Sequence, residues 1–229
     1  MSELSIQTPD GDFGAYLATP GQVPAPALIL LQEVYGVNRF MRRISDHWAG
    51  EGFLAACPHV YWRIAPGTVL DPETDGHREQ ALELGKQLDV EQAVEDIGVL
   101  AEALRARPEC NGRVAVSGYC LGGKLAYLCA TRGKVDCAVS YYGVGIEGWL
   151  GEADALSAPL LMHIGEADPW TPPEVREQLA GALGSRADVR SFNYPDTDHA
   201  FAREGASTDV PAMRELANGR TLEFLREYL

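Results

Sequence analysis

The residue types around Cys120 and their spacing indicate that this cysteine could be a nucleophile. The stretch Arg113-Val-Ala-Val-Ser-Gly-Tyr-Cys-Leu-Gly-Gly-Lys-Leu-Ala-Tyr127 passes from strand-forming to helix-forming residues, with glycines on both sides of Cys120. This pattern predicts a strand, a sharp turn and a helix, because glycines let the two elements approach closely. On such a turn the thiol lies at a helix N-terminus, where the helix dipole favours the reactive thiolate. A buried structural cysteine is the alternative interpretation.

Two further residues that could take part in catalysis also follow predicted strands. Asp168 comes after the strand at 159–165, and His199 comes after the strand at 189–194. Cysteine, aspartate and histidine in this order match the nucleophile, acid and base of a hydrolytic triad on an α/β sheet. His199 would transfer protons, and Asp168 would accept its other ring N–H. Asp198 is a second candidate for the acid, although a neighbour in sequence is poorly placed to reach the ring.

Backbone N–H groups are expected to complete this chemistry. An oxyanion hole in this type of fold uses the N–H after the nucleophile and one after an early strand, here Leu121 and Val34. Glu33 precedes Val34 and follows an apolar run, where a carboxylate must be hydrated or paired. A salt bridge to an arginine would explain Glu33, and so would a catalytic or gating role near the thiol.

The elements around these residues predict an α/β fold. Alternating residues at 4–8 and 13–18, separated by the turn 9–12, indicate an antiparallel hairpin. Apolar runs indicate buried parallel strands, and helical spacing indicates the intervening helices. The further strands are expected at 25–31, 52–57, 113–119, 136–143, 159–165 and 189–194, and the helices at 39–50, 73–88, 90–104, 173–183 and 210–228, with one more after Cys120.

The arrangement of these elements places the candidate residues together. Strands that alternate with helices, without a linker, predict a single α/β domain over residues 1–229, and the cysteine turn makes it an α/β-hydrolase domain. We expect a doubly wound, mostly parallel sheet of about eight strands, with helices on both faces and the hairpin at its N-terminus. Ligands of such sheets bind beyond the carboxyl ends of the strands, where every candidate residue lies.

Composition excludes several classes of partner. A formal charge of −14 opposes binding to nucleic acids and anionic membranes. The N-terminus lacks the pattern of a signal peptide, so we expect a cytoplasmic protein. Five unclustered cysteines suggest neither a disulfide framework nor a metal site, and Cys57 and His59 lack further ligands. No cofactor is expected, and we expect a monomer.

Motifs along nearly the whole chain resemble the bacterial dienelactone hydrolases, or carboxymethylenebutenolidases. The similarity rests on five segments, of which the cysteine turn is the most specific. They are Gln32-Glu-Val-Tyr-Gly-Val-Asn38, His77-Arg-Glu-Gln-Ala81, Gly118-Tyr-Cys-Leu-Gly-Gly123, Ser140-Tyr-Tyr-Gly-Val-Gly145 and His199-Ala-Phe-Ala-Arg203.

The resemblance implies an activity and assigns roles to individual residues. It implies hydrolysis of dienelactone to maleylacetate, in the catabolism of aromatic and chloroaromatic compounds. Cys120, Asp168 and His199 would form the triad, and Glu33 would control the proton of the thiol. Arg78 and Arg203 would bind the substrate carboxylate, a task that suits bidentate guanidinium groups. Tyr35 and Tyr142 are further candidates for substrate binding.

A cysteine nucleophile also restricts the substrate on chemical grounds. A tetrahedral intermediate expels the better leaving group, and a thiolate leaves before a simple alkoxide. Attack on an ordinary alkyl ester should therefore revert, whereas an enol lactone releases a resonance-stabilised enolate. We hypothesise that Cys120 rests largely as a thiol and that carboxylate binding to Arg78 and Arg203 frees Glu33 to take its proton.

Other functions fit parts of the same pattern. The helix after Arg78 carries Leu82 and Gly85, where aromatic residues are expected in family members that act on dienelactone. A related lactone or an activated ester could therefore be the substrate, as in a cysteine-dependent esterase or thioesterase. A non-catalytic protein that binds ligands or senses oxidants through its thiol is the alternative of another class. Asp168 and His199 argue against a sensor, which needs no ordered hydrolytic base.

Overall fold

The computed structural model describes residues 2–229, whose strands and helices alternate as predicted. The strands are β1 (Ser2–Thr8), β2 (Gly11–Ala18), β3 (Ala25–Leu31), β4 (Leu54–Pro58), β5 (Cys110–Tyr119), β6 (Cys137–Tyr141), β7 (Leu160–Gly165) and β8 (Val189–Tyr194). The helices are α1 (Arg39–Gly50), α2 (His77–Gln87), α3 (Val90–Arg105), α4 (Leu121–Thr131), α5 (Pro173–Leu183) and α6 (Pro211–Tyr228), with a 3₁₀ helix η1 (Ile146–Ala155).

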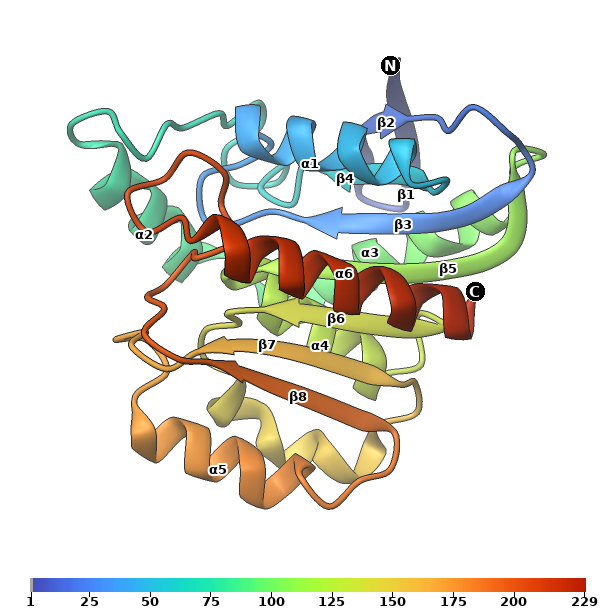
Figure 1. The fold of residues 1–229 in the computed structure, drawn as a ribbon. Helices are drawn as coiled ribbons and strands as arrows, with labels where there is room; N and C mark the ends of the chain where they lie inside the picture. The colour runs from blue at the N-terminus through green and yellow to red at the C-terminus, as the bar shows by residue number, and fades with distance from the viewer. Residues whose placement is uncertain (1) are drawn as a thin grey trace. The chain divides into compact units, whose positions relative to one another are not determined.

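The eight strands form one mostly parallel sheet in the order β1-β2-β4-β3-β5-β6-β7-β8, and helices surround the strands (Figure 1). This confirms the predicted doubly wound α/β fold. The described residues divide into two compact units, Met1–Val116 and Ser117–Leu229. Each unit is described by itself, and a single domain over residues 1–229 remains a prediction.

Unit 1, Met1–Val116, contains the N-terminal hairpin. Strands β1 and β2 pair antiparallel around a two-residue turn, because Thr8 lies opposite Gly11. Gly11 has φ +138°, a conformation that side chains rarely adopt. Strand β4 pairs antiparallel with β2 and parallel with β3. The apolar residues of β3 and β4 are nearly all buried, as the continuous apolar runs predict.

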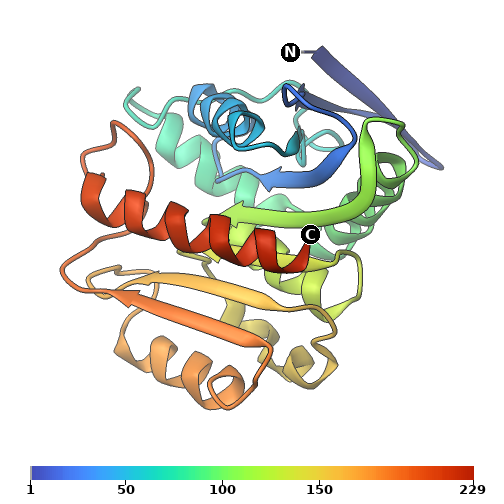
Figure 2. The same cartoon turned by 45° about the vertical axis from the view of Figure 1, so that its right-hand side comes forward.

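Unit 2, Ser117–Leu229, contains a parallel three-stranded region in which β7 pairs with β6 and with β8. Helix α4 packs against β6, and α6 packs against β6 and β7. The two helices lie on opposite faces of these strands (Figure 2). Because the strands are parallel, the loops after β6, β7 and β8 emerge at one edge. Asp168 and His199 lie in the second and third of these loops.

The largest differences from the prediction are in α2, β5 and η1. Helix α2 begins at His77 instead of residue 73, because Gly76 has φ +78° and the preceding residues form turns. Strand β5 begins earlier, at Cys110. The 3₁₀ helix η1 was not predicted, since Gly148 and Gly151 interrupt any apolar periodicity. Among the described residues, no helix combines the length and apolar content needed to cross a bilayer.

Candidate active site

Cys120 lies on the sharp turn between β5 and α4, as predicted. Its backbone has φ 56° and ψ −114°, a strained conformation for a residue with a Cβ. Hydrogen bonds hold the turn on both sides. The Cys120 N–H donates to the carbonyl of Tyr141 at 3.0 Å, and the Cys120 carbonyl accepts from Gly123 N at 3.0 Å and Val144 N at 3.3 Å. These bonds therefore fix the backbone from which the thiol projects.

The glycines of the turn are required by close backbone contacts. A Cβ at Gly118 would stand 1.9 Å from the carbonyl oxygen of Gly122. A Cβ at Gly123 would stand 2.7 Å from the Cα of Gly143, in the loop after β6. Real atoms do not approach so closely, so a side chain at Gly118 or Gly123 would move the backbone at the thiol. The sequence indicated Gly118 but not the contact between Gly123 and Gly143.

His199 and Asp168 form a hydrogen-bonded pair in the loops after β8 and β7. The Nδ1 of His199 lies 2.8 Å from Oδ2 of Asp168. The other oxygen, Oδ1, accepts the backbone N–H of Trp170 at 2.8 Å. Only 2% of Asp168 is exposed, so these two bonds hold the carboxylate in one orientation. Asp168 is thus placed to fix the tautomer of His199.

Asp198, the competing candidate, bonds a different part of His199. Its Oδ1 accepts the backbone N–H of His199 at 2.6 Å. The side chain of Asp198 therefore supports the loop, whereas that of Asp168 holds the imidazole. The backbone N–H of Ala167 donates to the carbonyl of Thr197 at 2.9 Å and joins the two loops.

The His199 ring also interacts with the proposed nucleophile. Burial opposes a charge on the ring, but the negative charge and hydrogen bond of Cys120 and the carboxylate of Asp168 outweigh burial. Together they raise the pKa of His199 to about 10. A negative charge on Cys120 therefore favours the imidazolium form of His199.

Aromatic residues surround the His199 ring. Tyr142 has φ 39° and meets the edge of that ring, with the centroids 5.1 Å apart. Tyr142 is fully buried. A buried ring is better placed to position the imidazole than to contact a substrate. Trp170 lies 6.4 Å from His199 and is 42% exposed. The sequence analysis missed Trp170, although an aspartate two residues before it is a common signal for this type of turn.

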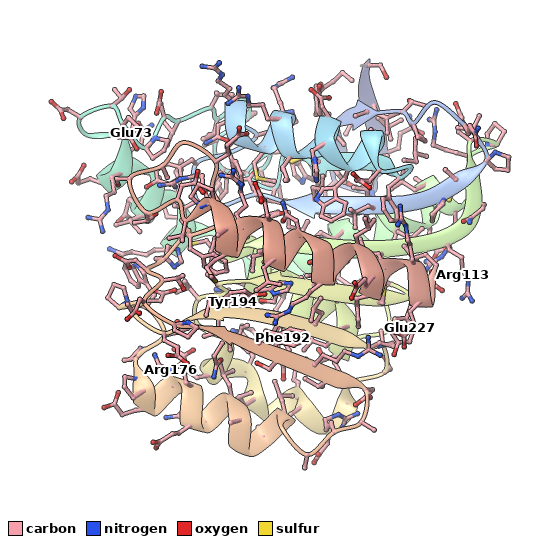
Figure 3. All side chains as sticks on the ribbon, viewed as in Figure 1. Glu73, Arg113, Arg176, Phe192, Tyr194 and Glu227 are labelled. Atoms are coloured by element: carbon pink, nitrogen blue, oxygen red, sulfur yellow. The ribbon has the colours of Figure 1, made fainter. Side chains whose placement is uncertain are left out.

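The loop that carries Asp168 is also held from α5. Arg176 donates through Nη1 to the carbonyl oxygens of Glu166 and Thr171, both at 2.9 Å, and it projects from the start of α5 (Figure 3). A Cβ at Gly165 would stand 2.6 Å from the carbonyl oxygen of Thr197, so this glycine allows the close approach of the two loops. Neither Arg176 nor Gly165 was singled out from the sequence.

Two other predicted site residues belong to unit 2. Leu121 is the first residue of α4, so its N–H has no partner within the helix and can bind an oxyanion beside Cys120. Arg203 is partly buried in the turn after His199, where its N–H donates to the carbonyl of Ala200 at 2.9 Å. Unit 2 thus contains the three proposed triad residues, one proposed oxyanion donor and one of the two predicted arginines.

The remaining predicted site residues belong to unit 1. Glu33 is 2% exposed, and Val34 and Tyr35 follow it in the loop after β3. Tyr35 is buried against Leu70 and Ala81. Arg78 is exposed on the first turn of α2. These placements identify Glu33 as the buried carboxylate of this loop and Arg78 as a solvent-accessible cation.

The two positions that lack aromatic residues lie on α2. Leu82 is partly buried. A Cβ at Gly85 would stand 3.1 Å from Cγ1 of Val34, which is tighter than most contacts of this kind. An aromatic side chain at Gly85 would therefore displace Val34 or α2. The glycine allows α2 to approach the loop that supplies the second proposed oxyanion donor.

The sequence matches a known enzyme family over nearly its whole length. Residues 13–229 match the model of the dienelactone hydrolase family. A carboxymethylenebutenolidase of Pseudomonas putida is 41% identical over 223 residues, which cover 97% of this chain and 94% of the relative.

Solved structures show the same fold. A Klebsiella pneumoniae protein is 27% identical and superimposes with a TM-score of 0.88 over 99% of this chain and 98% of its own. An α/β hydrolase of Penicillium sp. sh18 has a TM-score of 0.72 at 15% identity, over 99% of this chain and 98% of its own, which shows similarity of fold alone.

Proposed function

Because the chain belongs to the dienelactone hydrolase family and is a carboxylic ester hydrolase, we propose that it opens an enol lactone through a thioester at Cys120. The substrate that we propose is dienelactone, and the product is maleylacetate. One observation carries the proposal: the Nδ1 of His199 bonds Asp168 at 2.8 Å, in the same unit in which the turn before α4 holds Cys120 at φ 56°. This arrangement supports a nucleophile, a base and an orienting acid in the predicted order.

The first step is attack by the thiolate on the lactone carbonyl. The carbon–sulfur bond forms, and the carbonyl electrons move to the oxygen. The N–H of Leu121 binds this oxyanion, and we propose that the N–H of Val34 is the second donor. When the carbonyl re-forms, the ring C–O bond breaks and the enolate leaves. The imidazolium of His199 gives its proton to a carbon of the enolate, which becomes the ketone of maleylacetate, and His199 is left neutral.

The second step hydrolyses the acyl thioester. Neutral His199 takes a proton from a water molecule, whose oxygen attacks the thioester carbonyl. Collapse of the intermediate breaks the carbon–sulfur bond and returns the electron pair to the sulfur of Cys120. Asp168 stabilises the imidazolium that forms in this step. The carboxylic acid product then loses its proton to solvent.

Residues of unit 1 are proposed to bind the substrate and to control the proton of the thiol. Arg78, together with Arg203 of unit 2, would bind the substrate carboxylate and offset the overall charge of −14. Glu33 would control the proton of the thiol. The buried position of Glu33 supports a role inside the protein over one in solvent.

A second candidate function is hydrolysis of activated esters or thioesters on the same residues. Gly85, whose small size lets α2 approach Val34, and Leu82 leave this helix without the expected aromatic residues. A pocket without these rings would accept a different acyl group. Aryl esters and thioesters release leaving groups that a thiolate can displace, so the proposed nucleophile suits them equally.

The test is a spectrophotometric assay of cis- and trans-dienelactone with the wild type and Cys120→Ala. We expect wild-type turnover and complete loss in the variant. Retained turnover in Cys120→Ala would refute the nucleophile. A panel of dienelactone, aryl esters and acyl thioesters, compared by kcat/KM, separates the two candidate functions.

A further inference from the structure

His163 is a buried imidazole that takes no part in the steps above. It lies in β7, and none of its surface is exposed. Its Nδ1 lies 2.7 Å from the hydroxyl oxygen of Tyr194, and its Nε2 lies 2.9 Å from Oγ1 of Thr221. The ring therefore joins the end of β8 to helix α6 in the interior of unit 2 (Figure 1).

The hydrogen bonds continue from Thr221 to β6. Its Oγ1 lies 2.7 Å from the hydroxyl oxygen of Tyr141, the last residue of β6. The Tyr141 hydroxyl donates to Oδ1 of Asn218 on α6 at 2.9 Å. We call Tyr194, His163, Thr221, Tyr141 and Asn218 the polar chain. It links β6, β7 and β8 to one helix.

The acceptor at one end fixes the direction of every bond in the polar chain. Oδ1 of Asn218 can only accept, so it uses the single proton of the Tyr141 hydroxyl. Thr221 must then donate to Tyr141 and accept from Nε2 of His163. The ring is neutral at neutral pH, because burial lowers the pKa of His163 to about 3. Its one proton is therefore on Nε2, and Nδ1 accepts the O–H of Tyr194.

The backbone of the polar chain also holds the turn of the proposed nucleophile. The carbonyl of Tyr141 accepts the N–H of Cys120 at 3.0 Å, and the carbonyl of His163 accepts the N–H of Tyr142 at 2.8 Å. The ring of Tyr142 in turn meets that of His199. Both strand residues thus bond the polar chain through their side chains and the proposed site through their carbonyls.

Tyr194 holds the other two loops in the same way. Its carbonyl accepts the backbone N–H of Glu166 at 3.0 Å and the hydroxyl of Thr197 at 2.8 Å. Glu166 lies in the loop that carries Asp168, and Thr197 lies in the loop that carries His199. A buried polar chain whose members are all bonded accepts one arrangement, whereas apolar side chains of similar size would tolerate several. The polar chain is therefore suited to fix these loops relative to one another.

We propose that His163 is a positioning residue whose Nε2–H tautomer aligns the ends of β6, β7 and β8, and with them the loops that carry the proposed triad. The proposal rests on the proposed function in taking Cys120, Asp168 and His199 as that triad. A small displacement of reacting groups lowers the rate of the chemical step strongly. Because the polar chain acts through the loops and not on the substrate, its loss should lower kcat and change KM little.

The first test breaks the polar chain at its centre. Thr221→Val replaces the hydroxyl by a methyl group of similar size, and we expect kcat to fall by about tenfold while KM changes by less than about twofold. Thr221→Ser keeps the hydroxyl and should retain kcat within about twofold. Thr131→Val is the matched control. It removes another buried threonine hydroxyl of unit 2, which donates to the carbonyl of Leu128 at 3.0 Å, and should leave kcat unchanged.

The second test removes the donor to Nδ1. Tyr194→Phe should lower kcat with the same small change in KM. Tyr127→Phe removes a buried hydroxyl that donates to the carbonyl of Trp149 at 3.3 Å and should leave kcat unchanged. Because Thr221→Val and Tyr194→Phe break one chain, the double variant should lose little more than the more impaired single variant. Losses that multiply would contradict a shared positioning effect.

Nitrogen-15 NMR of the histidine-labelled protein tests the tautomer without an assay of activity. The His163 signals, identified by their absence in His163→Gln, should show the proton on Nε2 at pH 7 and at pH 5. A proton on Nδ1 of the wild type would contradict the derived direction of the bonds and overturn the proposal.

Unchanged kcat in folded Thr221→Val and Tyr194→Phe would also overturn the proposal, as would equal losses in the two controls. If Thr221→Val fails to fold, Tyr194→Phe decides by the same criterion. Failure of the proposed function is distinguishable, because kcat is measured with whichever member of the ester and lactone panel is hydrolysed. No turnover of dienelactone removes the proposed substrate, and retained turnover in Cys120→Ala removes the nucleophile, but neither changes the NMR result.

Discussion

The carboxylate of Asp168 lies 2.8 Å from Nδ1 of His199, although the two residues are separated by 31 positions in the sequence. Asp198, the immediate neighbour of His199, bonds its backbone N–H instead. The polar group that controls the imidazole therefore comes from the loop after β7, and the adjacent aspartate stabilises only the loop.

We expect Asp168→Asn to lower kcat/KM by about 10³- to 10⁴-fold. An asparagine can retain the geometry, but it favours the wrong tautomer and does not stabilise the imidazolium. Asp198→Asn should change kcat/KM by less than about tenfold, because its amide oxygen can still accept the backbone N–H. Steady-state assays of both variants measure the difference. Similar losses in both would contradict the assignment of Asp168.

Much of this site could be predicted from the sequence because the local chemistry of its turns is distinctive. The Gly118–Gly122 pattern indicated the strand, turn and helix, and the structure places Cys120 at φ 56° on this turn. The alternation of strands and helices was sufficient to predict the sheet. These features depend on residues close together in the chain, where steric rules act directly.

The features that could not be predicted depend on contacts between distant segments. Gly165 allows two loops to approach, and Gly123 lies against Gly143. Tyr142 packs against His199 only because the loop after β6 folds beside the loop after β8. An isolated glycine or tyrosine in the sequence carries no signal of its distant partner.

We expect Cys120→Ser to change which esters are hydrolysed. A serine alkoxide and an alkyl alkoxide leave about equally well, so attack on a simple alkyl ester no longer reverts preferentially. The ratio of kcat/KM for an alkyl ester to kcat/KM for dienelactone should therefore rise by at least about tenfold, even if both values fall. Parallel assays of the two substrates give this ratio. An unchanged ratio in the active variant would contradict the leaving-group explanation.

The gating hypothesis for Glu33 predicts slow alkylation of Cys120 without substrate. If Glu33 takes the thiol proton only after the substrate carboxylate binds Arg78 and Arg203, Cys120 of the substrate-free protein stays a thiol, which alkylates slowly. Iodoacetamide labelling at neutral pH, followed by mass spectrometry of wild type and Glu33→Gln, measures this. Fast labelling of the wild type that is undiminished in Glu33→Gln would refute gating.

A buried histidine outside the proposed site should determine the acid stability of unit 2. The Nδ1 of His163 lies 2.7 Å from the Tyr194 hydroxyl, and its Nε2 lies 2.9 Å from Oγ1 of Thr221. Arg220 on α6 covers the rings of Phe192 and Tyr194, which project from β8 (Figure 3). Burial, with a smaller effect of the Arg220 charge, lowers the pKa of His163 to about 3.

The sign of this effect follows from the two pKa values. In the unfolded chain a histidine has a pKa of about 6.5, so below that pH the unfolded state binds a proton that folded His163 excludes. The stabilisation is complete above about pH 6.5 and is lost as the pH falls towards 3. From pH 7 to pH 5, His163 should therefore lower the free energy of unfolding by about 2 kcal/mol.

Urea denaturation of the wild type and His163→Gln at pH 7 and pH 5 tests this expectation. The wild type should lose about 2 kcal/mol more than His163→Gln over this interval, because the variant has no group that titrates at this position. Comparing the two proteins cancels the contribution of His199, whose raised pKa gives stability that is lost only as the pH rises towards 10. His47→Gln, which removes an exposed histidine from α1, should behave as the wild type. Equal losses in the wild type and His163→Gln would show that His163 does not determine the acid stability.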